Sequence, residues 1–341
     1  MKRYRNKLGS LFKKHEDMLL ISSAILIFVI FSLIILPLLL ITIVNNDELP
    51  NIERLSIDIP VKVYLHKTGD TVTLDLEEYV AGVVAGEMPS SFEFEALKAQ
   101  AVAARTYALS KVVRGEKFGN SADHPNAPLC DDTHCQVYRS EQELLELKGS
   151  DWMKNSWPKI KDAVATTLGE VMFYGGELVE QPLYHSSSGG KTENSEDVFV
   201  SNLPYLRSVE SKYEDEAPHQ SESISISFNT FKEKIQNTYG ASSINPNTIK
   251  ILKRSEGGRV EEIQVGDKTL KGRDIRELFN LRSANFTFAF DGNNNIVFTT
   301  RGFGHGVGMS QWGANGMAQA GFNYKEILKH YYTGVTVKQV N

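Results

Sequence analysis

The longest apolar stretch of the chain lies near its N-terminus. From Met18 to Val44 there are 27 residues without a charged side chain, and most are Leu, Ile, Val or Phe. As a helix this stretch is about 40 Å long, enough to cross a hydrocarbon core of about 30 Å. Residues 18–45 are therefore predicted to be a transmembrane anchor, followed by a polar stalk at 46–58. The alternative is a cleaved signal peptide, which has an apolar core of about 7–15 residues.

Beyond residue 58 the pattern alternates between strand and helix periods. Apolar and polar residues alternate at 61–66 and 71–76, around a Lys-Thr-Gly-Asp turn, which predicts a hairpin. A second hairpin is predicted from 171–174 and 177–184. Helices are predicted at 77–85, 92–113, 157–167, 310–320 and 325–332, with Ser90 or Ser91 as the cap of the second and Ser310 as the cap of the fourth.

The stretch 220–300 has a pattern of its own. Helical periodicity is found at 229–239 and 273–281, and strand patterns at 249–254, 260–265 and 295–300. We interpret it as a small α+β lobe inserted into the main domain. The predicted fold class is thus α+β, with a catalytic core formed by residues 59–219 and 301–341.

Charge gives the orientation of the predicted anchor. Residues 1–17 hold six Lys or Arg and two acids, whereas the whole chain has a formal net charge of −5. Positive charge is retained in the cytoplasm, so residues 1–17 are expected inside and the acidic remainder outside the cell membrane. No later segment reaches 18 apolar residues, which predicts a single pass. The acidic body argues against a nucleic-acid binder, because such proteins carry a basic surface.

Glu87 is the first candidate for catalysis. It follows the apolar run Val83-Val84-Ala85-Gly86 at the end of a predicted helix. Burial there would raise the pKa of the carboxyl, which suits a general acid. The alternative is a helix-end carboxylate in water.

Arg105 and His305 are further candidates with structural alternatives. Arg105 lies on the apolar face of the helix predicted at 92–113, where a buried guanidinium needs a carboxylate or an anionic ligand, so a structural salt bridge competes with substrate binding. His305 lies among Gly302, Gly304, Gly306 and Gly308, whose lack of side chains lets the backbone approach a ligand or another strand.

The loop 118–136 collects the only two cysteines of the chain. His124, Cys130, His134 and Cys135 offer the nitrogen and sulfur ligands of a zinc site. A Cys130–Cys135 disulfide is the alternative in an oxidising compartment, and free thiols are a third. The loop 185–194 (HSSSGGKTEN) contains serines and Lys191. Its glycines favour a substrate-lining loop over a serine-lysine catalytic pair.

Three long motifs connect these separate candidates. They are EEYVAGVVAGEMP at 77–89, EALKAQAVAARTY at 95–107 and GFGHGVGMSQWGA at 302–314. Together they resemble the stage II sporulation protein D family of spore-forming Firmicutes. The resemblance covers nearly the whole chain, including the N-terminal apolar segment.

The resemblance implies a peptidoglycan lytic transglycosylase of the engulfing septal or mother-cell membrane. It implies cleavage of the MurNAc–GlcNAc linkage in glycan strands stripped of stem peptides, with Glu87 as the catalytic acid. Arg105, Ser187, Lys191, His305 and Gln311 are the expected substrate-binding residues. The implied partners are the amidase and endopeptidase stage II sporulation protein P and the membrane protein stage II sporulation protein M.

The resemblance also bears on the metal. The chemistry requires no cofactor, but a clostridial relative carries zinc on one His and two Cys. His124, Cys130 and Cys135 match these ligands best, with His134 as an alternative. Two other functions stay open at this point. One is a non-catalytic peptidoglycan-binding scaffold that recruits an amidase, and the other is a zinc hydrolase.

Overall fold

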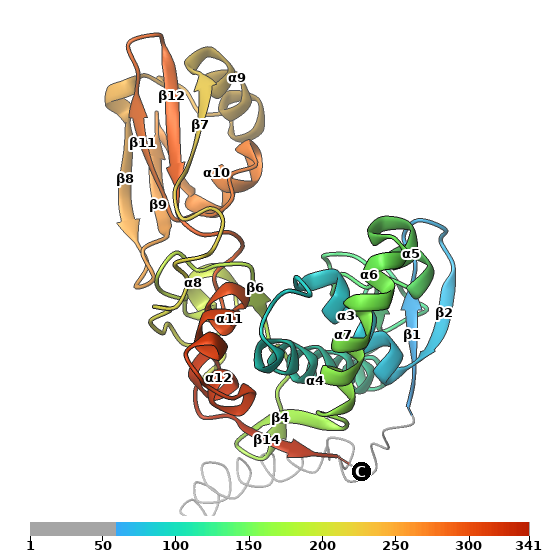
Figure 1. Cartoon of the computed structure of the whole chain (residues 1–341). Coiled ribbons are helices and arrows are strands. Elements are labelled where there is room, and N and C mark those ends of the chain that lie inside the picture. Colours follow the sequence, from blue (N-terminus) through green and yellow to red (C-terminus); the bar gives the residue numbers. More distant parts are fainter. Residues whose placement is uncertain (1–58, 341) are drawn as a thin grey trace, which may run out of the picture. The chain divides into compact units, whose positions relative to one another are not determined.

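The structure is a computed structural model that describes residues 59–340 (Figure 1). The segments expected as cytoplasmic N-terminus, anchor and stalk lie outside the described residues. Within 59–340, none of the helices combines the length and the apolar character needed to cross a bilayer.

Helices and strands alternate along the described chain, which confirms the mixed α+β class. The first elements are β1 (Pro60–Tyr64), β2 (Thr71–Asp75), α3 (Leu76–Glu87), α4 (Phe94–Phe118), β3 (Leu129–Cys130), α5 (Glu141–Lys148), α6 (Ser150–Asn155), α7 (Trp157–Ala165), β4 (Glu170–Tyr174), β5 (Glu177–Leu178), β6 (Tyr184–His185) and α8 (Ser195–Val198). They are followed by β7 (Glu222–Ser227), α9 (Phe228–Tyr239), a 3-10 turn (Pro246–Thr248), β8 (Ile249–Arg254), β9 (Val260–Val265), β10 (Lys268–Lys271), α10 (Gly272–Phe279), β11 (Phe286–Phe290), β12 (Asn295–Thr300), β13 (Met309–Ser310), α11 (Gln311–Gln319), α12 (Tyr324–Tyr331) and β14 (Thr336–Gln339).

Helix α4 is the centre of the first core. Its alanine-rich sequence keeps it narrow, so α3, α7, α11, α12 and β4 all pack closely against it. The predicted serine cap is wrong. The N-cap is Glu93, whose side chain makes no capping hydrogen bond, because Ser90 and Ser91 are part of a preceding turn in which the Phe92 amide bonds to the Pro89 carbonyl at 3.0 Å.

The predicted first hairpin is confirmed, since β1 and β2 pair antiparallel. The second predicted hairpin is confirmed at its turn, where β4 pairs with β5, but its second strand is shorter than predicted. Strand β5 ends at Leu178, and Tyr184 belongs instead to β6, which pairs in parallel with β13 from the far end of the chain.

Residues 222–300 carry a hydrophobic cluster of their own, built on Phe231, Ile263, Ile275 and Phe298. Figure 1 shows α9 and α10 beside the strands of this lobe. Strands β8, β9 and β12 have the bounds that alternation predicts. Glu222 of β7 pairs with Thr300 of β12, so the two ends of the lobe are neighbours. The domain boundaries at 220 and 300 stay a prediction.

The glycines at 302–308 allow the close approach that their spacing predicts. A Cβ on Gly308 would lie 2.0 Å from the Leu183 carbonyl oxygen, and one on Gly306 would lie 2.1 Å from Cζ of Arg259. Both residues have positive φ, 74° and 85°. The run thus packs its backbone directly against the segment that leads into β6 and against the lobe.

Candidate active site

Glu87 is the last residue of α3, and its carboxyl faces the segment that follows the cysteine loop. The Val137 amide donates a hydrogen bond of 2.8 Å to Glu87 Oε1. The approach depends on Gly86, because a Cβ there would lie 2.4 Å from the Val137 carbonyl oxygen. The glycine next to the carboxylate therefore lets a neighbouring backbone hold it.

Burial raises the pKa of the Glu87 carboxyl above its ordinary value. The hydrogen bond from Val137, the side chains of Gln311 and Tyr184, and the charge of Arg139 act in the opposite direction. None of these neighbours is an acid. The site thus offers one partly desolvated carboxyl with hydrogen-bond donors around it, which suits a group that gives and takes a proton.

Gln311 reaches this site from the C-terminal motif. Its Nε2 donates to the backbone carbonyl of Glu87 at 3.2 Å. The contact is fixed because Ser310 caps α11 as predicted, accepting a 3.0 Å hydrogen bond from the Gly313 amide. The Trp312 ring packs edge-on against Phe92 at 4.8 Å. The motifs at 77–107 and 302–314 therefore meet at Glu87, and the role of Gln311 in substrate binding stays a prediction.

Tyr184 is a site residue that sequence reasoning missed. Its hydroxyl is buried and has no hydrogen-bond partner among residues 59–340. Burial, and next the charge of Glu87, raise the pKa of Tyr184, so the hydroxyl stays a proton donor. The only sequence signal was its place directly before the loop at 185–194.

Arg105 forms the structural salt bridge that the sequence left open as the alternative to substrate binding. Its side chain is fully buried. Nε lies 2.7 Å from Oε1 and Nη2 lies 2.5 Å from Oε2 of Glu77. Nη1 also donates to the Glu170 carbonyl oxygen at 3.1 Å. The structure therefore contains the salt bridge between Arg105 and Glu77, which connects α4 to the start of α3.

Ser187 and Lys191 are used in contacts within the protein. Ser187 is buried, and its amide and carbonyl pair with Phe303. Lys191 Nζ lies 2.8 Å from Oε1 of Glu256. The next serine, Ser188, donates its hydroxyl to the buried Glu214 carboxylate at 2.7 Å, which argues against a serine nucleophile.

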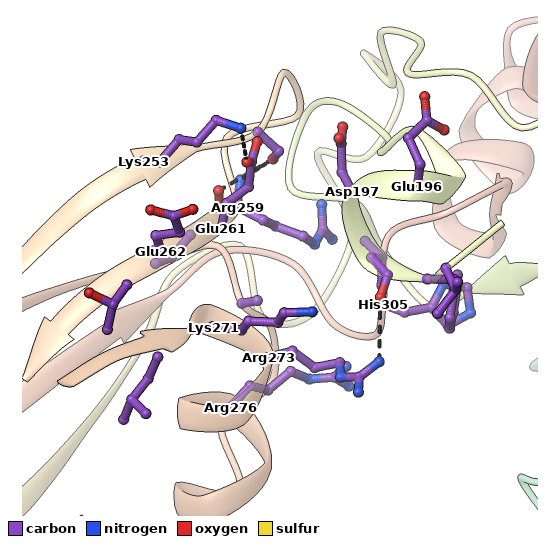
Figure 2. Close-up of a pocket in the computed structure, with 18 of the residues that line it drawn as sticks. Glu196, Asp197, Lys253, Arg259, Glu261, Glu262, Lys271, Arg273, Arg276 and His305 are labelled. Atoms are coloured by element: carbon purple, nitrogen blue, oxygen red, sulfur yellow. Dashed lines mark hydrogen bonds and ion pairs between the residues drawn. The ribbon is translucent and has the colours of Figure 1, made fainter. Parts of the chain in front are cut away.

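His305 lines a different cavity from the Glu87 site (Figure 2). Its ring lies 5.6 Å from that of His185 and 5.5 Å from that of Phe199, measured between centroids. Burial and then the charges of Arg259 and Arg276 lower the pKa of His305 to about 3. The imidazole is therefore neutral at physiological pH.

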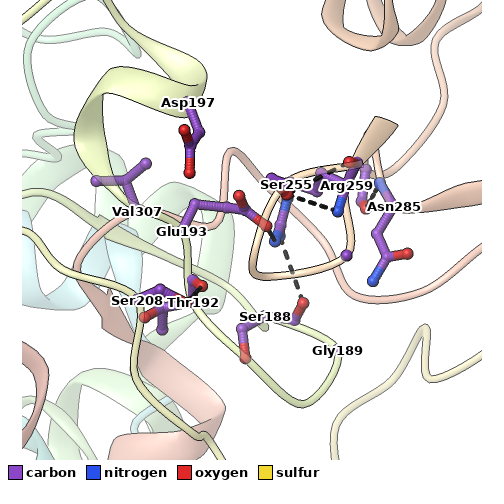
Figure 3. A network of polar contacts seen from close by, with 12 residues as sticks. Ser188, Gly189, Thr192, Glu193, Asp197, Ser208, Ser255, Arg259, Asn285 and Val307 are labelled. Carbon is purple, nitrogen blue, oxygen red and sulfur yellow. Dashed lines mark hydrogen bonds and ion pairs between the residues drawn. The ribbon is translucent and has the colours of Figure 1, made fainter. Parts of the chain in front are cut away.

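A buried ion pair joins the loop at 185–194 to the lobe. Figure 3 shows the Glu193 carboxylate facing the Arg259 guanidinium, with 3.1 Å between Oε1 and Nη1. The side chains are 0% and 3% exposed, so water does not screen the pair. The Glu193 amide also donates to the Gly306 carbonyl at 2.8 Å. The pair therefore fixes the glycine run, the loop and the lobe to one another.

The cysteine loop gathers four ligand atoms. One donor atom from each of His124, Cys130, His134 and Cys135 lies within 4.8 Å of the others. His124 Nδ1 lies 2.7 Å from the Ala127 carbonyl oxygen and must donate to it, which leaves Nε2 with a lone pair facing the cluster. Both cysteines are free thiols in the structure. Two sulfur and two nitrogen donors with a fixed tautomer fit the ligand set of structural zinc.

Comparison with known proteins decides the family. Stage II sporulation protein D of Bacillus amyloliquefaciens is 42% identical over 287 residues, which are 83% of this chain and 80% of the relative. The same protein of Bacillus subtilis is 40% identical over 285 residues, with the same coverage. The family described as Stage II sporulation protein matches residues 64–174. The chain belongs to the stage II sporulation protein D family.

Two further matches extend the comparison. A domain of unknown function (DUF8618) matches residues 196–308, which include the lobe. The amidase enhancer of Bacillus subtilis is 27% identical over 309 residues, which are 75% of this chain and 40% of the relative. This chain is thus similar over part of its length to a protein that is named an amidase enhancer.

Proposed function

We propose that this chain is a lytic transglycosylase that cleaves the MurNAc–GlcNAc bond of stripped glycan strands during forespore engulfment. The observation that carries the proposal is the Glu87 carboxyl, which is partly desolvated, is held by the Val137 amide and has no acid among the main groups that shift its pKa. Ordinary glycosidases need two carboxyl groups, because one of them activates water or attacks the sugar. A transglycosylase needs one.

The proposed reaction uses that one group twice. Glu87 gives its proton to the glycosidic oxygen as the C1–O bond breaks. The resulting carboxylate then takes the proton of the MurNAc C6 hydroxyl, whose oxygen bonds to C1 and closes a 1,6-anhydro ring. Glu87 ends protonated, as it began, and no water is consumed. In this proposal the Gln311 amide, which contacts the backbone of Glu87, also binds a sugar oxygen beside the reacting bond.

The decisive experiment compares the wild-type chain with Glu87→Gln on stripped glycan strands. Mass spectrometry should detect anhydro-ended products with wild type and none above background with Glu87→Gln. Glu78→Gln is the matched control, because Glu78 is exposed on the same helix. Equal products from wild type and Glu87→Gln would refute the proposal, and water-derived reducing ends would favour a hydrolase.

A second candidate is a scaffold without catalysis that recruits an amidase. The similarity to the amidase enhancer favours it. It predicts that Glu87→Gln leaves sporulation and amidase activity unchanged. The two functions are compatible in one chain, since a partner can bind away from Glu87. We propose stage II sporulation proteins P and M as partners on the strength of the family.

We further propose that residues 18–45 anchor the chain in the membrane with residues 1–17 in the cytoplasm. The support is the uncharged run Met18–Val44 and the six basic residues before it. Protease added to the outside of intact cells should remove the domain that contains Glu87 and spare an N-terminal tag. Protection of both parts would contradict this orientation.

We also propose that His124, Cys130, His134 and Cys135 hold zinc. Zinc here would supply a cross-link for the loop, a structural role. Cys135 is two residues before Val137, whose amide holds Glu87, and the intervening Gln136 accepts a 3.3 Å hydrogen bond from the Tyr79 hydroxyl. A metal that fixes the position of Cys135 would therefore also help to fix Val137, and with it the Glu87 carboxyl.

A further inference from the structure

A cavity of 690 Å³ lies between α8 and the lobe, and Glu87 is not among its lining residues. Consecutive residues of a strand point to opposite faces. In β6, Tyr184 faces Glu87, while the ring of His185 packs against His305, which lines the cavity. The cavity and the Glu87 site are therefore on opposite sides of β6, and the cavity needs a function of its own.

Positive charge faces the interior of this cavity. Figure 2 shows the side chains of Lys271, Arg273 and Arg276 pointing toward the space beside His305. The carboxylates of Glu196, Asp197 and Glu262 point away from these three. Of the lining acids, Glu196 is paired with Arg207 and Glu261 with Lys253.

Arg276 is a partly buried cation that lines this cavity. Within residues 59–340 no carboxylate forms an ion pair with it, and Nε donates only to the Leu281 carbonyl at 3.3 Å. Burial, and next the neighbouring Arg259, lower the pKa of Arg276, whereas the charge of Glu277 raises it without an ion pair. A partly buried guanidinium without an ion pair is unfavourable, and an anion in the cavity would reduce that cost.

Part of the cavity lining is apolar and exposed. Phe199 is 37% exposed and Val200 is fully exposed, at the end of α8. The Phe199 ring lies at an angle of 65° to that of His305. Since His305 is neutral, Phe199 and His305 offer ring surfaces without charge, beside Glu196 and Asp197 of α8, which also line the cavity. The cavity is thus complementary to a body with apolar faces that carries one negative group.

We propose that this cavity binds a carboxylate of a peptidoglycan fragment, with Lys271 and Arg276 on the carboxylate and Phe199 and His305 against the body of the ligand. The ligand class rests on the proposed function, which makes peptidoglycan the substrate. Two sources supply the same chemistry. One is the lactyl carboxylate of N-acetylmuramic acid in a stripped strand, and the other is the terminal carboxylate of a stem peptide.

Titration calorimetry on the full chain tests the proposal, with Glu87→Gln present so that no probe is cleaved. The probes are N-acetylmuramic acid, a stem tetrapeptide and N-acetylglucosamine, which lacks the carboxylate. At least one acidic probe should bind, and N-acetylglucosamine should not. Lys271→Gln and Arg276→Gln should each weaken binding roughly tenfold, because each removes a charged hydrogen bond. Lys268→Gln is the control, since Lys268 lies on β10 outside the cavity.

Each outcome bears on the proposal. Binding of N-acetylmuramic acid that depends on Lys271 supports the glycan as the source, and binding of the tetrapeptide alone supports the peptide. Equal binding of N-acetylglucosamine, unchanged affinity in both cavity variants, or no binding of any probe would overturn the proposal. Lys271 is exposed, so Lys271→Gln should fold normally and keeps the test valid even if Arg276→Gln misfolds. Glycan cleavage is measured separately with the chain that keeps Glu87. Cleavage without binding of any probe would refute only the proposed carboxylate site. Binding without cleavage would refute only the proposed transglycosylase activity.

Discussion

The backbone amide of Val137 lies 2.8 Å from Oε1 of Glu87, although 50 residues separate the two in the chain. A backbone donor is kept in every substitution except that by proline, and it holds the carboxyl without bringing a charge to it. Burial raises the pKa of Glu87 while this donor lowers it, so the proton affinity of the group depends on the position of one loop.

Gly86→Ala tests how closely that loop must approach. The new Cβ would lie 2.4 Å from the Val137 carbonyl oxygen, so either the loop or α3 must shift. Such overpacking costs about 1–3 kcal/mol, and the shift would also weaken the hydrogen bond to Glu87. We expect a lower free energy of unfolding in urea and slower glycan cleavage. The control is Gly292→Ala, where nothing lies within 4 Å of the new Cβ. Identical behaviour of the two variants would contradict the expectation.

Tyr184→Phe tests the pKa of the Glu87 carboxyl. The hydroxyl favours the ionised form of Glu87, so its removal raises the pKa of Glu87 further. Catalysis requires the protonated acid and is lost as the pH rises through that pKa. The alkaline limb of the pH–kcat profile should therefore move to higher pH, with kcat reduced. Tyr213→Phe, at an exposed tyrosine, should leave the profile in place. A shift to lower pH would show that Tyr184 acts otherwise.

The same carboxyl should cost the protein stability. Its folded pKa is raised above the unfolded value, so between the two values the native state binds more protons and stability falls as pH rises. Glutamine has no charge to bury. The melting temperature of Glu87→Gln should thus exceed that of wild type by more at pH 8 than at pH 4. A difference independent of pH would mean that Glu87 does not titrate differently in the two states.

Arg105→Lys tests the structural assignment of Arg105. Lysine cannot reproduce the two hydrogen bonds to Glu77 and leaves the carbonyl of Glu170 without its donor. We expect the free energy of unfolding to fall by about 3 kcal/mol, with KM unchanged in the folded fraction. The control is Arg114→Lys on the exposed face of α4. Full stability with a raised KM would return Arg105 to the substrate site.

Metal removal tests the cysteine loop. Elemental analysis should find one zinc per chain in wild type and none in Cys135→Ser. Chelation should lower the melting temperature, because the loop loses its cross-link, while slow cleavage of glycan persists. Complete loss of cleavage without a change in melting temperature would instead indicate a metal that takes part in the reaction. A disulfide in the purified protein would exclude the zinc ligand set.

Local pattern predicted much of this fold. Alternation gave the bounds of β8, β9 and β12, and helical spacing placed α3 and α9 to within two residues at each end. These elements are stabilised by contacts between residues close in sequence or by one apolar face. The α4 cap was wrong because the Glu93 amide is satisfied by Asn315, more than 200 residues away.

The candidate site shows the same limit. Glu87 could be predicted from the apolar residues before it, and Gln311 could be predicted from the motif at 302–314. Tyr184 was not visible, because its position depends on the two-residue strands β6 and β13, which have no periodicity to detect. The structural role of Arg105 needed the position of Glu77 on a different helix. His305 resembles a cleft residue in sequence, but β6 separates it from Glu87.

The pairing of Glu222 with Thr300 makes the lobe removable. Residues paired across two antiparallel strands have Cα atoms about 5 Å apart, so a turn of a few residues can replace everything between them. The losses would include the Arg259 partner of Glu193, which Glu193→Gln would neutralise, and the bonds that Arg259, Arg282 and Asn285 make to the core. The same junction can accept foreign cargo, such as a fluorescent protein, in place of the lobe. A chain built in this way can exchange what it recognises while the machinery around Glu87 stays as it is.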